Sequence, residues 1–176
     1  MGDFVKGPLS GRYGAEITRA LVLHRRIDAY TDAHHIVYQS RRRVSPERRR
    51  FAGILVDMFY DHFLARHWDQ YHDVPLERFT ARVYCALREH EALLPLRLRD
   101  IARGMADADW LGSYRHVEAV SIALDRMGQR LKRGNALLRS ADELRAHYEA
   151  FDADFHAFFP DVVRFARGEQ DQSASG

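Results

Sequence analysis

The spacing of apolar residues is the feature that most constrains the fold of this chain. Between Gly14 and about Ala33, Ile17, Leu21 and Ile27 recur at helical spacing, and comparable steps continue through most of the sequence. No stretch alternates apolar and polar residues as a strand would. A chain with this pattern buries one side of each helix against its neighbours. The sequence therefore predicts an all-α protein, a compact helical bundle.

The expected helices are divided at proline, glycine and polar breaks. After the first helix they cover about residues 34–44, 46–71, 76–94, 96–105, 109–127 and 140–167, with a cap at Ser45-Pro46-Glu47, a break at Gly112-Ser113 and a kink at Phe159-Pro160. Hydrophobic residues make up 46% of the 176 residues, so the chain can form a core, and its length suits one domain. We expect that domain over residues 1–167 and a disordered tail over residues 168–176.

Composition argues against several classes of protein. The formal net charge is only +2, and the basic runs carry no recognised binding motif, which argues against a nucleic-acid-binding protein. The single cysteine, Cys85, excludes an internal disulfide. No apolar run approaches the roughly 18 residues of a membrane span, and no signal peptide is recognisable. We therefore expect a cytoplasmic protein without membrane or nucleic-acid partners.

A first polar cluster lies on the first predicted helix. His24, Asp28 and Asp32 are one turn apart, so they form a single stripe, and Arg25 and Arg26 project to its sides. An imidazole and a carboxylate on a rigid helix are ligands for a divalent cation. The stripe is equally compatible with a solvated face on which the carboxylates pair with arginines.

A second cluster lies on the helix expected after Pro46. Asp57 and Asp61 are again one turn apart, but apolar residues surround them, so this helix is expected to be buried. A buried carboxylate needs a cation, an arginine or other hydrogen-bond donors. We favour a metal site at Asp61 with the adjacent His62. Pairing with arginine remains the alternative for the carboxylates, and core packing remains the alternative for His62 and His67.

Several multi-residue blocks occur along the chain in a specific order. They are Gly2-Asp3-Phe4-Val5-Lys6-Gly7, His24-Arg25-Arg26-Ile27-Asp28 with Thr31-Asp32, Asp57, and Asp61-His62-Phe63-Leu64-Ala65-Arg66-His67-Trp68, followed near the end by Tyr148, Phe151, Phe155 and Phe158-Phe159-Pro160. In these blocks the chain resembles the bacterial acyl carrier protein phosphodiesterases, and the resemblance covers most of its length.

This resemblance implies a hydrolase that uses Mn²⁺, or another divalent cation, to remove the 4′-phosphopantetheine arm from the serine of holo-acyl carrier protein. It also implies an HD-like helical fold, because the family is a distant relative of the HD-type phosphohydrolases. The implied metal ligands are Asp3, His24, Asp28, Asp61 and His62. Asp57 and Asp32 would support this site, Arg25 and Arg26 would bind the phosphate, and His62 or His67 would protonate the leaving serine oxygen.

The chemistry of a phosphodiester accounts for these residue types. Its negative charge repels hydroxide, so the site needs a cation that neutralises an oxygen and acidifies a water. Arginine holds the remaining oxygens with paired hydrogen bonds. Because acyl carrier proteins are strongly acidic, Arg41-Arg42-Arg43 and Arg48-Arg49-Arg50 are candidates for docking the carrier, and an ordinary solvated helix face is the alternative.

The chain departs from the family at its amino end. Members usually begin with a further helix, rich in leucine and histidine, before the residues that match Gly2-Asp3-Phe4. Without that helix, we expect a metal site short of histidines and Asp3 on a frayed end. Two alternatives therefore stay open. One is an HD-like phosphohydrolase acting on another phosphodiester or a nucleotide, and the other is a catalytically impaired helical protein that binds the carrier.

Overall fold

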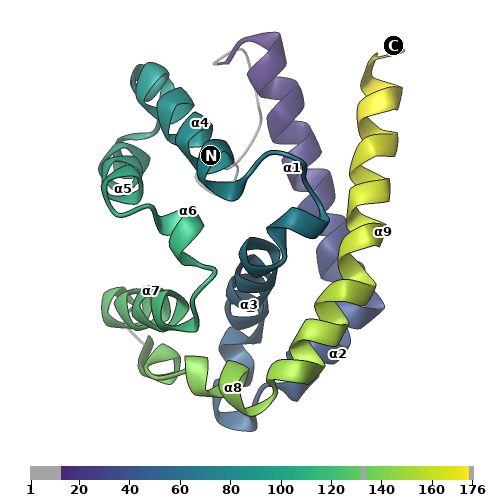
Figure 1. Cartoon of the computed structure of the whole chain (residues 1–176), viewed down its shortest axis with the longest axis vertical. Coiled ribbons are helices and arrows are strands. Elements are labelled where there is room, and N and C mark those ends of the chain that lie inside the picture. The colour runs from purple at the N-terminus through teal and green to yellow at the C-terminus, as the bar shows by residue number, and fades with distance from the viewer. Residues whose placement is uncertain (1–12, 132–133, 175–176) are drawn as a thin grey trace.

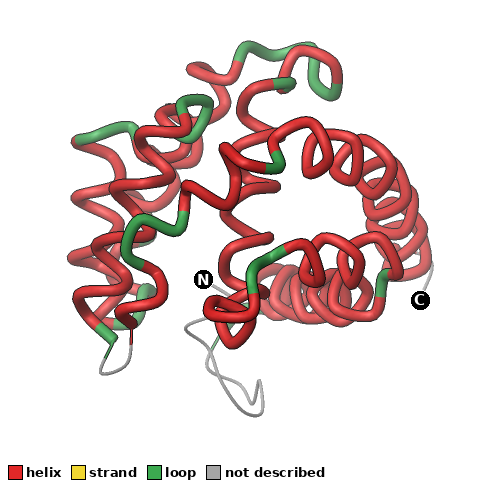
Figure 2. Tube along the Cα trace, turned by 90° about the horizontal axis from the view of Figure 1, so that it is seen from below, coloured by secondary structure: helices red, strands yellow, loops and turns green. Residues whose placement is uncertain are grey.

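The structure of the protein is a computed structural model that describes residues 13–131 and 134–174 (Figure 1). Its α-helices are α1 (Ala15–Ala33), α2 (His35–Arg43), α3 (Ala52–Arg66), α4 (Leu76–Glu89), α5 (Leu96–Asp107), α6 (Trp110–Ser113), α7 (Val117–Arg130), α8 (Ala141–Ala146) and α9 (Tyr148–Ala174). Short 3-10 turns join them: η2 (Pro46–Phe51), η3 (Trp68–Gln70), η4 (Glu91–Leu93) and η5 (Gly134–Leu137). The described ranges contain no strand (Figure 2), which confirms the prediction of an all-α fold. None of these helices is long and apolar enough to cross a membrane.

Prolines set the boundaries of two helices as the sequence predicts. α4 begins directly after Pro75 and α5 directly after Pro95, because the fixed φ of proline suits the start of a helix, where its missing N–H would have no partner within the helix. Leu94, the residue before Pro95, has the extended backbone that proline imposes on its predecessor.

The turn after Ser45 differs from the prediction. Pro46–Phe51 form the 3-10 turn η2, and the α-helix α3 begins only at Ala52. The Ser45 side chain makes no capping bond. Instead, the Ser45 backbone N–H donates to a Glu143 carboxylate oxygen at 3.2 Å, and Arg48 donates to the other oxygen at 3.2 Å. Glu143 belongs to α8, so a residue that is distant in sequence, and not a local cap, accepts the backbone hydrogen bond of this turn.

The central element is α3, which packs against α2, α7 and α9 (Figure 1). Its Phe59 and Phe63 meet Phe151 and Phe155 of α9, and all four side chains are at most 1% exposed. The Phe59 and Phe151 rings pack edge to face, with their centroids 5.1 Å apart. Burial of each such ring stabilises the fold by roughly 1.5–3 kcal/mol. This aromatic contact therefore holds α3 and α9 firmly together.

The carboxyl-terminal helix extends further than expected. His147 separates α8 from α9, and α9 continues through Gly168 to its end, where composition predicts a disordered tail. Arg26 of α1 pairs with Glu169, and this contact holds the last turns of α9 against α1. Pro160 lies within α9, and Figure 1 shows the helix changing direction along its length.

A smaller arm of the molecule consists of α4, α5 and α6. Leu98 and Ala102 of α5 are buried in a second apolar cluster. The Tyr84 hydroxyl of α4 donates to an Asp109 carboxylate oxygen at 3.0 Å and accepts from the Leu111 N–H at 2.9 Å, which fixes the turn into α6. Since α6 in turn contacts α3, this arm is anchored to the central helix.

Candidate active site

The first polar cluster lies on α1 and is open to solvent. The His24 Nδ1 atom lies 2.8 Å from the Asp28 Oδ2 atom, one turn further along the helix. Asp32 instead pairs with Arg41 of α2, with 2.5 Å between Oδ1 and Nη2. Of the stripe predicted from the sequence, His24 and Asp28 therefore form one pair of nitrogen and oxygen donors. Asp32 is instead part of an ion pair with Arg41.

The two predicted clusters meet at a cleft of about 620 Å³. Asp57 of α3 and Asp32 of α1 both line it. The other charged residues of the cleft are arginines from α2 and η2, namely Arg41, Arg42 and Arg49. Guanidinium groups bind phosphate oxygens through paired hydrogen bonds. The cleft is therefore suited to a phosphate group or to an acidic protein segment.

Asp61 lies one turn after Asp57 on the same helix. The Asp61 residue is accessible to solvent. The surrounding protein nevertheless removes much of the hydration of its carboxyl, and this raises the pKa of Asp61 to about 7. The negative charge of Asp57 adds to the rise. Burial, together with the charge of Asp61, raises the pKa of the Tyr114 hydroxyl to about 12. A carboxyl that is half-protonated near neutral pH is suited to proton transfer, and a nearby cation would stabilise its charged form.

His62 is fully buried and bonded at both ring nitrogens. Its Nδ1 atom lies 2.7 Å from the Tyr114 carbonyl oxygen, and its Nε2 atom lies 2.8 Å from the Tyr148 hydroxyl oxygen. A carbonyl only accepts, so Nδ1–H donates to it and Nε2 accepts the hydroxyl proton of Tyr148. Burial lowers the pKa of His62 and so favours this neutral form. In this arrangement His62 ties α3 to the loop between α6 and α7 and to α9.

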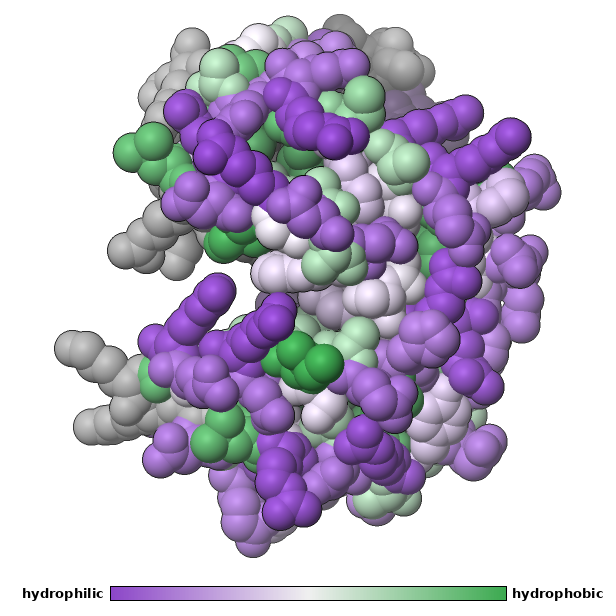
Figure 3. Space-filling model, turned by 60° about the vertical axis from the view of Figure 1, so that its left-hand side comes forward, coloured by the Kyte–Doolittle hydropathy of each residue, from purple (hydrophilic) through white to green (hydrophobic). Residues whose placement is uncertain are grey.

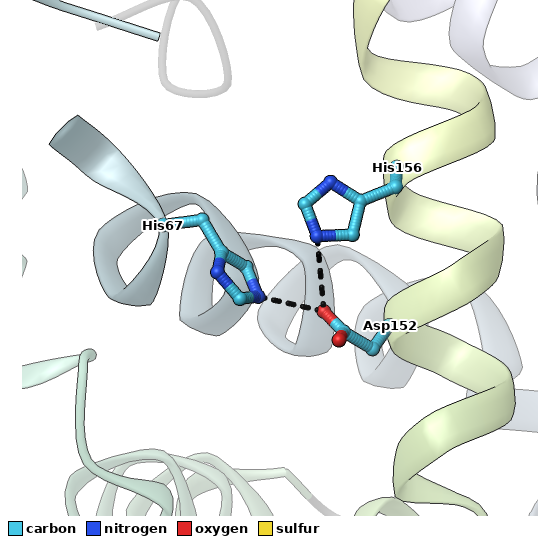
Figure 4. Close-up of side chains that lie close together, drawn as sticks. All are labelled: His67, Asp152 and His156. Atoms are coloured by element: carbon cyan, nitrogen blue, oxygen red, sulfur yellow. Dashed lines mark hydrogen bonds and ion pairs between the residues drawn. The ribbon is translucent and has the colours of Figure 1, made fainter. Parts of the chain in front are cut away.

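His67 follows α3 directly and belongs to a different cluster (Figure 4). Its Nε2 atom lies 2.8 Å from the Asp152 Oδ1 atom, and the His156 Nε2 atom lies 3.7 Å from the same oxygen. One ligand atom from each residue lies within 4.8 Å of the other two, and within the described ranges this is the one group of three such residues close enough to share a metal ion. Sequence reasoning missed Asp152 and His156, although their spacing of one turn on a mainly apolar helix is the signal that identified the other clusters.

The remaining predicted residues are more dispersed. Arg25 is exposed on α1, whereas Arg26 pairs with Glu169 of α9. Asp3 lies outside the described residues. Within the described ranges, His24, Asp28 and Asp61 do not come together as a group of three close ligands. The structure thus brings the two predicted clusters to one cleft through Asp32 and Asp57, but not around a single point.

A second pocket, of about 530 Å³, opens beside Tyr114 between the α5–α6 arm and α7. Figure 3 shows the surface hollowed on this side of the molecule, with polar residues along the rim. The pocket walls are mainly apolar and include Ile101, Trp110, Ile122 and Met127, with Arg126 and Arg130 also lining it. Since the charge of Asp61 helps to raise the pKa of the Tyr114 hydroxyl, Asp61 is the α3 carboxylate on the side of this pocket.

Comparison with known proteins decides the family. Residues 1–162 match the family described as acyl carrier protein phosphodiesterase. The chain belongs to the acyl carrier protein phosphodiesterase family. Its relatives include proteins of that name from Klebsiella pneumoniae subsp. pneumoniae, 36% identical over 174 residues, and from Pectobacterium atrosepticum, 33% identical over 171 residues. Each alignment covers 97% of this chain and 89% of the relative. No solved structure matches the chain significantly.

The donor types in the polar clusters match those of a divalent cation, although the described residues do not bring three of these donors close together. His24, Asp28 and Asp61 offer imidazole nitrogen and carboxylate oxygen, a mixture that manganese accepts. Burial, and to a lesser extent the charge of Asp57, raises the pKa of Asp61, and a cation beside this carboxyl would favour its charged form.

Proposed function

We propose that this protein is a cytoplasmic hydrolase that cleaves the phosphodiester between the serine of holo-acyl carrier protein and its 4′-phosphopantetheine arm. The products would be the apo carrier and free phosphopantetheine. The family match over residues 1–162 carries this proposal. It is supported by relatives named acyl carrier protein phosphodiesterase that align over 89% of their own length.

The reacting phosphate would lie at the cleft lined by Asp57. Arg41, Arg42 and Arg49 supply cationic hydrogen-bond donors there, and Arg25 on α1 would approach from the side of the first cluster. The pantetheine arm, which carries a dimethyl group as well as amides, would extend toward the apolar pocket beside Tyr114.

A divalent cation, manganese in the first instance, is part of this proposal. Asp3, His24, Asp28 and Asp61 would hold it. When bound, it would neutralise a phosphate oxygen and lower the pKa of an attacking water. In its absence the Asp61 carboxyl keeps a proton up to about pH 7, so cation binding below that pH should release a proton to solvent.

The same surface would attract the carrier. Three of the six clustered arginines are occupied within the protein, because Arg41 pairs with Asp32, Arg43 with Asp154 and Arg48 with Glu143. The other three, Arg42, Arg49 and Arg50, are exposed on α2 and η2. A basic surface at the mouth of the cleft would speed and orient the encounter with an acidic protein.

A substrate comparison tests the proposal. The full chain with Mn²⁺ is incubated separately with holo-acyl carrier protein, with bis(4-nitrophenyl) phosphate and with a cyclic nucleotide. Loss of the phosphopantetheine mass from the carrier, with little turnover of the two small diesters, supports a carrier hydrolase. Rapid turnover of a small diester beside an untouched carrier favours a general phosphohydrolase. Carrier binding without either reaction favours a protein that only binds the carrier.

A further inference from the structure

The cluster at the carboxyl end of α3 contains no residue of the cleft or of the proposed manganese site. We propose that His67, Asp152 and His156 form a second metal site, selective for a transition-metal ion such as Zn²⁺. His67, which the sequence suggested as a proton donor, would then be a metal ligand.

The distances within the cluster suit such an ion. Tetrahedral Zn²⁺, with bonds of about 2.0–2.1 Å, keeps its ligand atoms about 3.3 Å apart. The Asp152 Oδ1 atom lies 2.8 Å from the His67 Nε2 atom and 3.7 Å from the His156 Nε2 atom. These two distances bracket the required value, and the ligand atoms of the two histidines lie within 4.8 Å of each other, so side-chain rotations that bring them closer would admit the ion.

The ligands are held on elements that are already rigid. Asp152 and His156 are one turn apart on α9, so both point to the same side of that helix (Figure 4). His67 follows the last turn of α3, where its ring stacks on Phe63 with an interplanar angle of 9°. Since α3 and α9 are packed together by their aromatic residues, the two halves of the site keep a fixed separation.

The far nitrogens of both imidazole rings have partners of the kind that support a metal ligand. The Tyr71 hydroxyl oxygen lies 2.7 Å from His156 Nδ1, and the Gln70 side-chain amide lies 3.4 Å from His67 Nδ1. A hydrogen bond donated by Nδ1–H fixes the ring and leaves the Nε2 lone pair for the metal. Tyr71 can accept such a bond, and Gln70, which is exposed, can turn its amide oxygen to accept the other.

Access and ligand type indicate which ion would bind. The side chains of His67, Asp152 and His156 are 18%, 24% and 36% exposed, so an ion can reach them while the protein still shields the site. Two imidazoles and one carboxylate favour zinc and similar ions over the oxygen-seeking calcium and magnesium. Three protein ligands also leave one position for water. A bound ion would link the end of α3 to α9.

Metal titration tests this proposal on the full chain after treatment with a chelator. Zn²⁺ binding is measured by calorimetry, Co²⁺ by its visible absorption, and the melting temperature by circular dichroism. We expect one tightly bound Zn²⁺ per chain at this site and tetrahedral Co²⁺ bands. The melting temperature should rise by roughly 5–10 °C at a Zn²⁺ concentration of about one hundred times Kd. His156→Gln, which keeps a polar side chain near Tyr71, should lower the affinity at least tenfold.

Matched variants separate this site from the proposed manganese site. Asp152→Asn preserves the shape of the carboxylate and should also weaken binding, so the result does not depend on how well His156→Gln folds. His147→Gln, which changes an exposed histidine just before α9, should bind Zn²⁺ as the wild type does. Asp61→Asn should likewise keep the site. Absence of Zn²⁺ binding to the wild type, or binding lost in Asp61→Asn but unchanged in His156→Gln and Asp152→Asn, would overturn the proposal.

Discussion

Replacement of His62 by leucine tests whether this side chain supports the fold or holds a metal. Leucine fills a similar volume but cannot bond to the Tyr114 carbonyl or the Tyr148 hydroxyl. Each buried polar group that loses its partner costs about 1–3 kcal/mol. Tyr148 is only half-buried and can turn its hydroxyl to water, so the lower part of the range applies to it. The free energy of unfolding should fall by about 2–4 kcal/mol.

Equilibrium unfolding in urea, followed by circular dichroism, measures this loss. With a slope near 2 kcal/mol per molar, the midpoint should fall by roughly 1–2 M. His62→Asn is the matched variant, since its amide keeps a donor near the Nδ1 position and should lose about half as much. Manganese affinity, measured by electron paramagnetic resonance on the folded variants, should stay at the wild-type value. A His62→Leu protein that is as stable as the wild type but no longer binds manganese would refute the structural role of His62.

Three other perturbations probe the site and its support. Without metal, the raised pKa of Asp61 should make the free energy of unfolding fall as pH rises from about 4 to 7, because the folded state retains a proton that the unfolded state releases. Asp61→Asn should flatten this trend in urea titrations. An unchanged pH dependence would count against the raised pKa. Asp154→Ala removes the partner of Arg43, at 2.9 Å, and of buried Ser40, at 2.7 Å, and should lower the free energy of unfolding by about 2–4 kcal/mol in the same assay; a loss below about 1 kcal/mol would contradict this. Arg42→Ala should raise KM for the carrier more than it lowers kcat, and it should weaken the salt dependence of kcat/KM. Arg164→Ala, which changes an exposed arginine on α9, should leave KM, kcat and the salt dependence unchanged. Equal effects of the two substitutions would argue against a docking surface on α2.

Local patterns predicted the all-α class, the position of most helical segments and the polar stripe on α1. Apolar period and proline positions placed α1 and α5 within about two residues of their observed bounds, because these signals act within a few residues. They also placed the start of α4 at Leu76, but α4 ends at Glu89 and not at Leu94. The start of α3 could not be predicted in this way. Its preceding turn is fixed by Glu143, which lies far along the chain, and no pattern around Ser45 reveals that contact.

The roles of individual site residues depend even more on distant contacts. Helical spacing put Asp32 in a polar stripe and Asp57 in a helix expected to be buried. That helix is buried as expected, but Asp57 itself is exposed, and the structure brings it to one cleft with Asp32, where Arg41 neutralises Asp32. For His62, the two bonding partners lie 52 and 86 positions along the chain, so its sequence neighbours could not separate a core histidine from a ligand. His156 could have been identified by its one-turn spacing from Asp152, but only the folding of α9 against the end of α3 brings both of them to His67.

The most direct measurement of the central claim is the intact mass of holo-acyl carrier protein after incubation with this protein, with Mn²⁺ or with a chelator. We predict that the mass of the carrier decreases by that of the phosphopantetheine group and that its serine is left intact. The decrease should depend on metal and should be absent with Asp61→Asn. A carrier that keeps its full mass under every metal condition would contradict the claim. A product lighter than the apo carrier by one water would contradict hydrolysis and indicate elimination instead.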